Sequence, residues 1–267
     1  MNDTRLTIIL LAGQRPGVDP LASHFGIERK ALVPVAGRPM LDRVAQTLLK
    51  RDDVGRLVIV GQAPEGFFEH PQTRWLRGDP RVETHDGPGS IVEAILGAIA
   101  ARGLQWPILV TTADNVLLSN AMVDAFVAGA AGADIGVALV ERRTLEAAYP
   151  GNKRTWLRFR GGAYSGANLF WLGGSGAEKA LGVWRGIEQQ RKKARAVLGA
   201  FGYGLALLIG LRIASLDQAI AIAGRRLGIR AKAVVLPQAE ACIDVDKLSD
   251  HELVEAIFAA RTLLPPN

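Results

Sequence analysis

The chain has 267 residues, 49% of them hydrophobic and 22% charged, and its 32 Lys and Arg residues against 26 Asp and Glu residues give a net charge of +6. This length and hydrophobic content are sufficient for a substantial core and argue against disorder beyond the chain ends. The single cysteine, Cys242, excludes an intramolecular disulfide and a cysteine-based zinc cluster, and we expect it to be a small core residue. The basic excess is spread along the chain without a zinc spacing, an aromatic RNA-binding pattern or a dense basic arm, so we expect no nucleic-acid partner.

The first forty residues combine an apolar run with a loop that suits an anion. Residues 8–17 read Ile-Ile-Leu-Leu-Ala-Gly-Gln-Arg-Pro-Gly, an order typical of a buried parallel strand that ends in an open loop. Gly13 and Gly17 leave backbone N–H groups accessible to a phosphate, and Arg15 and Lys30 add positive charge. On these residues alone an ordinary strand-to-loop turn is an equal alternative, and the spacing matches neither a Walker nor a Rossmann motif.

Leu-Ala-Gly-x-Arg-x-Gly at 11–17, a lysine at position 30 and Leu-x-Pro-Val-x-Gly-x-Pro-Met-Leu at 32–41 resemble the opening of the MobA-like nucleotidyltransferases, which have a glycosyltransferase-A-like fold. The resemblance implies that the loop holds the triphosphate of a nucleotide and that Lys30 neutralises charge during transfer. The nucleotide-binding positions that it indicates here are Leu11, Ala12, Gly13, Gln14 and Gly17. Two features depart from the common pattern: Gln14 stands where a second glycine is usual, and the loop from Gly17 to Lys30 is long.

The rest of the chain alternates predicted strands with predicted helices. The strands occupy 56–61, 107–112, 133–141, 153–160, 161–171 and 233–237, and the helices occupy 39–50, 91–102, 120–130, 216–228 and a final segment capped by Ser249 and Glu252. Such alternation predicts a mostly parallel sheet. With the resemblance, we expect a Rossmann-like three-layer α/β sandwich of the nucleotide-diphospho-sugar transferase type. We interpret 1–267 as a single nucleotidyltransferase domain with a helical, apolar insertion at about 183–229.

The stretch at 86–95 joins a glycine-rich turn to a helix. Ser90 and Glu93 form a capping box, so a capped surface helix after a turn is the simplest interpretation. In the resembled family a glycine-rich turn at this place lies against the nucleotide base, which makes Gly87, Gly89 and Ser90 candidates for nucleotide contact.

Three aspartates are candidates for a metal site. Asp114 follows the strand at 107–112, at the edge where open α/β sheets place ligands. An aspartate there often only caps the next helix, but Ser119 is better placed as that cap, so Asp114 is not needed for it. Mg²⁺ uses one or two carboxylates besides phosphates and water, and the resemblance implies that Asp114 is such a ligand. Asp244 and Asp246 are two residues apart, so in an extended chain they share a face. The alternative is that one of them only helps to turn the chain into the last helix. The Asp-Val-Asp sequence, however, is similar to the closing motif of the family. This resemblance favours Asp246 as the second metal ligand, with Asp244 as the second choice.

The acceptor side is less defined. The resemblance implies that Asn168 contacts the acceptor, while the basic alternation at 153–160 suits either a solvated strand face or an acidic acceptor. Residues 191–213 combine a basic cluster with sixteen uncharged residues, 196–211, which are too few and too glycine-rich for a membrane-spanning helix. Two interpretations of this segment stay open: a buried or subunit-facing helix, and an element in peripheral contact with a membrane surface. No signal peptide is evident, so we expect a cytoplasmic protein, with association with a membrane surface as the alternative.

Together these features predict a Mg²⁺-dependent nucleotidyltransferase that uses a nucleoside triphosphate and a phosphorylated small-molecule or cofactor acceptor and releases pyrophosphate. Arg15 and the loop would hold the β and γ phosphates, Lys30 would approach the α phosphate, and Asp114 with Asp246 would hold Mg²⁺. The alternatives are a glycosyltransferase of the same fold that uses a nucleotide-sugar, and a non-catalytic nucleotide-binding protein. The base, the acceptor and the oligomeric state are left open by the sequence.

Overall fold

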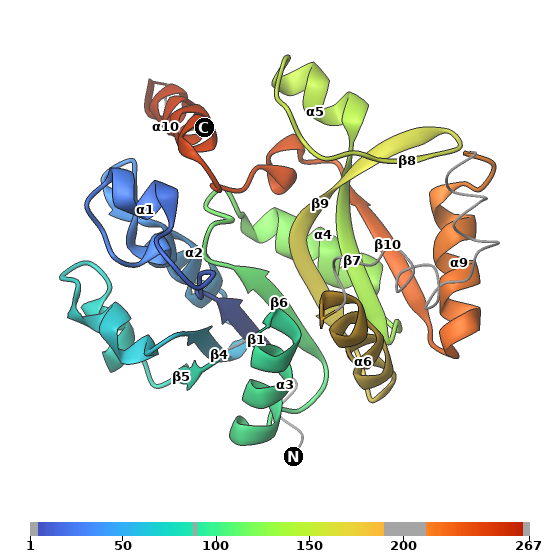
Figure 1. The fold of residues 1–267 in the computed structure, drawn as a ribbon, viewed down its shortest axis with the longest axis horizontal. Coiled ribbons are helices and arrows are strands. Elements are labelled where there is room, and N and C mark those ends of the chain that lie inside the picture. The colour runs from blue at the N-terminus through green and yellow to red at the C-terminus, as the bar shows by residue number, and fades with distance from the viewer. Residues whose placement is uncertain (1–4, 88–89, 190–211, 264–267) are drawn as a thin grey trace.

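The computed structural model describes residues 5–87, 90–189 and 212–263, and these form an α/β fold around one central sheet (Figure 1). The strands of this sheet are β1 (Leu6–Leu11), β4 (Val54–Gly61), β5 (Val82–Asp86), β6 (Ile108–Thr112), β7 (Ile135–Glu141), β8 (Leu157–Phe159), β9 (Gly162–Leu172) and β10 (Ala231–Leu236). The described helices are α1 (Pro20–His24), α2 (Met40–Leu49), α3 (Ile91–Arg102), α4 (Asn120–Ala130), α5 (Arg142–Ala148), α6 (Gly176–Gln189), α9 (Leu216–Leu227) and α10 (Leu248–Leu263). The connections contain a small hairpin of β2 (Pro34–Val35) and β3 (Arg38–Pro39) and the 3₁₀ turns η1 (Lys30–Leu32), η2 (Pro64–Glu69), η3 (Arg74–Gly78) and η4 (Ala239–Cys242).

The sheet is mostly parallel, as the sequence predicts. Its order is β10-β7-β9-β6-β1-β4-β5, and β8 pairs with β9 outside this path. β1 runs parallel to both β4 and β6, whereas β9 runs antiparallel to β6 and β7. Leu11 is in register with Val60 on one side and Thr112 on the other, so three strands end together at one edge. The carboxyl edge of such a sheet is where α/β proteins place their ligands.

Apolar side chains cover both faces of the central strands, because helices pack on each side. In β1, Ile8 and Leu10 belong to the cluster that includes residues of α2, α4 and α10, while Ile9 belongs to the cluster with residues of α3 and α6. Figure 1 shows α3 and α6 on one side of the sheet and α2 and α4 on the other. Cys242 is buried, as predicted, and burial raises the pKa of its thiol to about 11.

Most local signals in the sequence are confirmed. Ser90 and Ser215 form capping boxes with Glu93 and Gln218, and Ser119 caps α4. The cap predicted at Ser249 is wrong, because α10 begins at Leu248 and Ser249 lies inside the helix.

Of two further predicted segments, one is shorter in the structure and one lies outside the described residues. The strand predicted at 153–160 is reduced to Leu157–Phe159. Residues 196–211, for which we predicted a packed or membrane-surface helix, lie outside the described residues. Within the described part of the chain, no helix has the length and apolar character needed to cross a membrane.

Candidate active site

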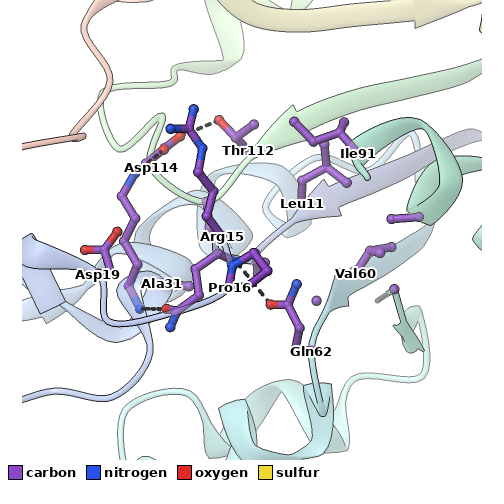
Figure 2. Close-up of a pocket in the computed structure, with 18 of the residues that line it drawn as sticks. Leu11, Arg15, Pro16, Asp19, Ala31, Val60, Gln62, Ile91, Thr112 and Asp114 are labelled. Carbon is purple, nitrogen blue, oxygen red and sulfur yellow. Dashed lines mark hydrogen bonds and ion pairs between the residues drawn. The ribbon is translucent and has the colours of Figure 1, made fainter. Parts of the chain in front are cut away.

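A cavity of about 860 Å³ opens at the carboxyl edge formed by β1, β4 and β6. Ten of the predicted site residues line it: Leu11, Ala12, Gly13, Gln14, Arg15, Lys30, Gly87, Ser90, Asp114 and Asp246. Gly17 and Asn168 are not among its lining residues, and Gly89 lies outside the described residues. In Figure 2 the Arg15 side chain points toward Asp114 and Thr112, so the loop after β1 and the end of β6 face one space.

Lys30 joins the two predicted metal ligands. Its Nζ lies 2.8 Å from Asp114 Oδ2 and 2.6 Å from Asp246 Oδ1. The Lys30 and Asp114 side chains are 14% and 18% exposed, whereas Asp246 is 64% exposed. Lys30 begins η1, Asp114 follows β6 and Asp246 lies between η4 and α10, so the fold brings three distant segments to one point.

This contact decides the charge state of the lysine. Burial alone would lower the pKa of Lys30, but the carboxylates of Asp114 and Asp246 outweigh it and raise the pKa above its ordinary value. Burial would likewise raise the pKa of Asp246, but its hydrogen bond with Lys30 brings that pKa below its ordinary value. Lys30 is therefore a fixed positive charge and is unsuited to act as a general base.

Asp114 is held from two directions. The Thr112 hydroxyl donates a hydrogen bond of 2.6 Å to Asp114 Oδ1, which leaves Oδ2 to Lys30. The Val245 N–H donates to the Asp114 carbonyl oxygen at 3.1 Å, so the closing Asp-Val-Asp segment is fastened to the end of β6. The sequence predicted Asp114 but not Thr112, although a hydroxyl two residues before a candidate ligand is a visible signal.

Gln14 ties the two ends of the long loop together. Its side-chain oxygen accepts from the Lys30 N–H at 2.7 Å, and its side-chain nitrogen donates to the Glu28 carbonyl at 3.1 Å. Its own N–H donates to Gln62 Oε1 at 3.0 Å, and the Gln62 carbonyl accepts from Arg29 at 2.8 Å. The departure from glycine at this position therefore supplies contacts that hold the backbone of Lys30. Gln62, which directly follows β4 and contacts Gln14, was not among the predicted site residues.

The glycines of the site have different roles. A Cβ on Gly13 would lie 3.2 Å from the Gln62 amide nitrogen, so glycine allows this close approach. A Cβ on Gly87 would lie 2.8 Å from both Val60 and Ala94, so Gly87 is required where β4 packs on α3. Gly17 has a φ of 105° with no atom near its Cβ position, and its role is the loop turn.

Asn168 and Asp244 face each other rather than the cavity. Asn168, in β9, has a φ of 48°, and its amide donates to Asp244 Oδ2 at 3.1 Å. Arg154 donates to Asp244 Oδ1 at 2.5 Å. Burial, followed by the charges of Asp114 and Asp246, raises the pKa of Asp244. Asp244 thus already has two partners, while Asp246 is bound through Lys30 and is more exposed.

The donor set fits a Mg²⁺ ion that takes few ligands from the protein. Within the described ranges no group of three or more His, Cys, Asp or Glu residues could hold a metal ion. Asp114 and Asp246, however, direct one oxygen each to the same cation, the Lys30 ammonium. Mg²⁺ commonly takes one or two carboxylates and completes its shell with substrate phosphates and water.

Comparison with known proteins places the chain in a family. The model of the MobA-like NTP transferase domain matches residues 7–198. A structure described as a hypothetical transferase from Thermus thermophilus is 32% identical, covers 92% of this chain and 99% of its own, and has a TM-score of 0.76. A 4-diphosphocytidyl-2C-methyl-D-erythritol synthase from Anaerococcus prevotii is 9% identical over 97% of each chain, with a TM-score of 0.58. A second synthase of that name is 13% identical over 95% of this chain and 99% of its own, with a TM-score of 0.53.

The two synthases show the fold alone, since their sequence identity is low. Comparison with curated proteins found no match. The match to the family model extends from β1 through α6 and includes the loop, Lys30 and Asp114. The chain therefore belongs to the family of MobA-like NTP transferase domains.

Proposed function

We propose that the protein transfers a nucleoside monophosphate from a nucleoside triphosphate to a phosphorylated small molecule or cofactor, in a Mg²⁺-dependent reaction that releases pyrophosphate. An acceptor oxygen attacks the α phosphorus, the bond to the bridging oxygen breaks, and pyrophosphate leaves with the electron pair. The observation that carries the proposal is the Lys30 ammonium held between Asp114 and Asp246 in the cavity beside the loop after β1. Membership of the NTP transferase family supports it.

The chain's own groups supply positioning and positive charge. The backbone around Gly13 and the Arg15 guanidinium line the cavity and are suited to the β and γ phosphates. Lys30, kept protonated by its neighbours, is suited to the charge that develops at the α phosphate. Leu11, Gly87 and Ser90 line the same cavity and are suited to the nucleoside. No covalent nucleophile is needed, because holding two mutually repelling anions in line accounts for most of the work.

Asp114 and Asp246 are the residues that would hold Mg²⁺. Bound there, the ion would neutralise phosphate charge and orient the triphosphate. Asp246 suits this role better than Asp244, because the Asp244 carboxylate is occupied by Arg154 and Asn168. The acceptor contact predicted for Asn168 stays a prediction, since that side chain does not line the cavity.

A thermal-shift panel of ATP, GTP, CTP and UTP, each with and without Mg²⁺, tests the proposal. A ligand that binds only the native state raises the melting temperature, by an amount that corresponds to about 2.7 kcal/mol at a concentration 100 times its Kd. We expect one triphosphate to stabilise the protein in a Mg²⁺-dependent manner, and pyrophosphate release then allows acceptors to be screened. Stabilisation by a nucleotide-sugar but by no triphosphate would favour the glycosyltransferase instead.

Replacing Gln14 with glycine tests whether this side chain positions Lys30. The variant loses the hydrogen bonds to the Lys30 N–H and the Glu28 carbonyl. We expect the free energy of unfolding to fall by about 1 kcal/mol. Triphosphate affinity should fall roughly fivefold to tenfold as the lysine backbone is released, which is about 1 kcal/mol or slightly more. Urea unfolding and triphosphate titration measure the two effects.

Gln105→Gly is the matched control, because Gln105 is an exposed glutamine near the amino end of β6 whose side chain donates within its own turn, to the Gly103 carbonyl. It should leave triphosphate binding unchanged. Wild-type affinity in Gln14→Gly would remove the positioning role.

Ser90 and Ser215 offer a paired comparison, because both cap a helix through the same capping box but only Ser90 lines the cavity. Ser90→Ala and Ser215→Ala should each lower the free energy of unfolding by about 1 kcal/mol. Only Ser90→Ala should also weaken triphosphate binding, measured by titration well below the melting temperature. Equal triphosphate binding in both variants would limit Ser90 to its role as a cap.

A further inference from the structure

Four aspartates lie close together at the cavity, two of them lining it and two beside these, and this concentration of negative charge requires compensation. Asp114 and Asp246 are bound by Lys30. Asp244 and Asp250 are bound by a second cation, Arg154. The proposed function uses Lys30 and the first pair but gives no role to Arg154.

Arg154 is a buried charge on the segment between α5 and β8. Its side chain is 9% exposed, and the Asp250 side chain is 8% exposed. One guanidinium nitrogen lies 2.5 Å from Asp244 Oδ1, and another lies 3.5 Å from Asp250 Oδ1. The Nε donates to Asn152 Oδ1 at 3.1 Å, which fixes the direction of the guanidinium within its own loop. A planar guanidinium suits this bridging of two carboxylates better than an ammonium does.

Both aspartates held by Arg154 connect directly to Asp246. Asp244 precedes Asp246 by two residues, and Asp250 Oδ2 accepts a hydrogen bond from the Asp246 N–H at 3.3 Å. The intervening Val245 N–H donates to the Asp114 carbonyl. Arg154 therefore holds the backbone on both sides of Asp246, while Val245 sets its distance from Asp114.

We propose that Arg154 is a positioning residue for the metal site, whose guanidinium bridges Asp244 and Asp250 and so holds the Asp246 carboxylate opposite Asp114. This role rests on the proposed function of the two carboxylates. Removing the guanidinium leaves the buried Asp250 carboxylate and the partly buried Asp244 carboxylate without their cation, an unfavourable state. The segment relaxes by separating these charges, and Asp246 moves away from Asp114.

The test measures metal binding directly, with Mn²⁺ alone as the probe and the loss of its free-ion EPR signal as the readout. The variants are Arg154→Gln, Arg154→Lys and the double variant Arg154→Gln with Asp244→Asn. We expect the half-saturating Mn²⁺ concentration to rise at least about tenfold in Arg154→Gln, a change of roughly 1.4 kcal/mol. It should rise less in Arg154→Lys and recover partly in the double variant, where one unpaired charge is gone.

Arg230→Gln is the matched control. Arg230 also pairs with an aspartate, Asp134, at 2.8 Å, but these residues precede β10 and β7 and so lie at the opposite edge of the sheet. Its Mn²⁺ half-saturation should equal that of the wild-type protein. Wild-type half-saturation in a folded Arg154→Gln protein would overturn the proposal.

Three further outcomes distinguish the inference from the proposed function. If circular dichroism shows that Arg154→Gln does not fold, Arg154→Lys takes its place, and wild-type Mn²⁺ binding in that variant would overturn the positioning role. If the wild-type protein binds Mn²⁺ only when a triphosphate is present, the same variants are compared in its presence. If it binds no Mn²⁺ in either case, the metal site itself is wrong, and the role of Arg154 is lost with it. If the wild-type protein binds Mn²⁺ and releases pyrophosphate, and Arg154→Gln does both equally well, this inference is overturned while the proposed function stands.

Discussion

Replacing Asp114 with asparagine is expected to lower turnover by at least about 10³-fold, roughly 4 kcal/mol of transition-state stabilisation. Asparagine keeps the size of the side chain and an acceptor for the Thr112 hydroxyl but removes the charge that faces Lys30. The stabilisation of the protein by triphosphate in the presence of Mg²⁺ should disappear as well. Pyrophosphate release and a Mg²⁺ titration of the melting temperature measure the two effects.

Asp124→Asn is the control for this experiment. Asp124 lies on α4 and pairs with Arg51, which precedes β4 at the amino edge of the sheet, far along the strands from the cavity. Its carboxylate is 63% exposed, and an exposed ion pair contributes about 1 kcal/mol or less to stability. We expect wild-type turnover. Substantial activity in Asp114→Asn, with the fold intact, would refute the assignment of Asp114 to the metal.

Replacing Lys30 with methionine should have two separable effects. The rate constant kcat/KM should fall about 10²- to 10³-fold, because a charge aimed at the reacting phosphate is lost. In the absence of Mg²⁺ the free energy of unfolding should also fall by roughly 1–3 kcal/mol, since Asp114 and Asp246 then face each other without a cation. Adding Mg²⁺ should restore part of this stability without restoring the rate.

Urea unfolding with and without Mg²⁺ tests the second effect, and Lys50→Met provides the comparison. Lys50 is an exposed lysine at the end of α2 and should affect neither stability nor its Mg²⁺ dependence. If Mg²⁺ stabilises the wild-type protein and Lys30→Met by the same amount, the ammonium does not occupy the position of a cation between the carboxylates.

The features of the fold that depend on local sequence were predictable. The apolar run of β1 and the capping boxes at Ser90 and Ser215 act over a few residues, so their patterns are visible in the chain. The start of α10 was misjudged, because Ser249 and Glu252 satisfy the capping pattern while the Lys247 carbonyl accepts the first helical hydrogen bonds.

The site depends on contacts that no local pattern records. Lys30 meets Asp114 across 84 positions and Asp246 across 216. Only the resemblance to a family predicted that these residues share one site. Hydrophobic periodicity gives no information on contacts between residues so far apart in the chain. Gln62 could have been suspected only from its place at the end of β4, because its partner Gln14 is 48 residues away.

Arg154 shows the same limit from the opposite direction. The alternation of basic and apolar residues around it predicted a strand face exposed to solvent or to an acceptor. Its guanidinium instead is buried against Asp244, 90 residues away in the chain. The sequence around a buried arginine does not differ from that around a surface arginine, because the carboxylates that pair with it come from distant parts of the chain.

The most direct test of the central claim follows the two ends of the triphosphate. The triphosphate chosen by the thermal-shift panel is labelled with ³²P at either the α or the γ position and incubated with Mg²⁺ and phosphorylated acceptors, and with a deproteinised cell extract as a wider source of acceptors. We predict that the α label enters a new product, that the γ label appears in pyrophosphate, and that both disappear with Asp114→Asn. Release of the γ label as orthophosphate, or as part of a phosphorylated acceptor, would contradict nucleotidyl transfer at this site.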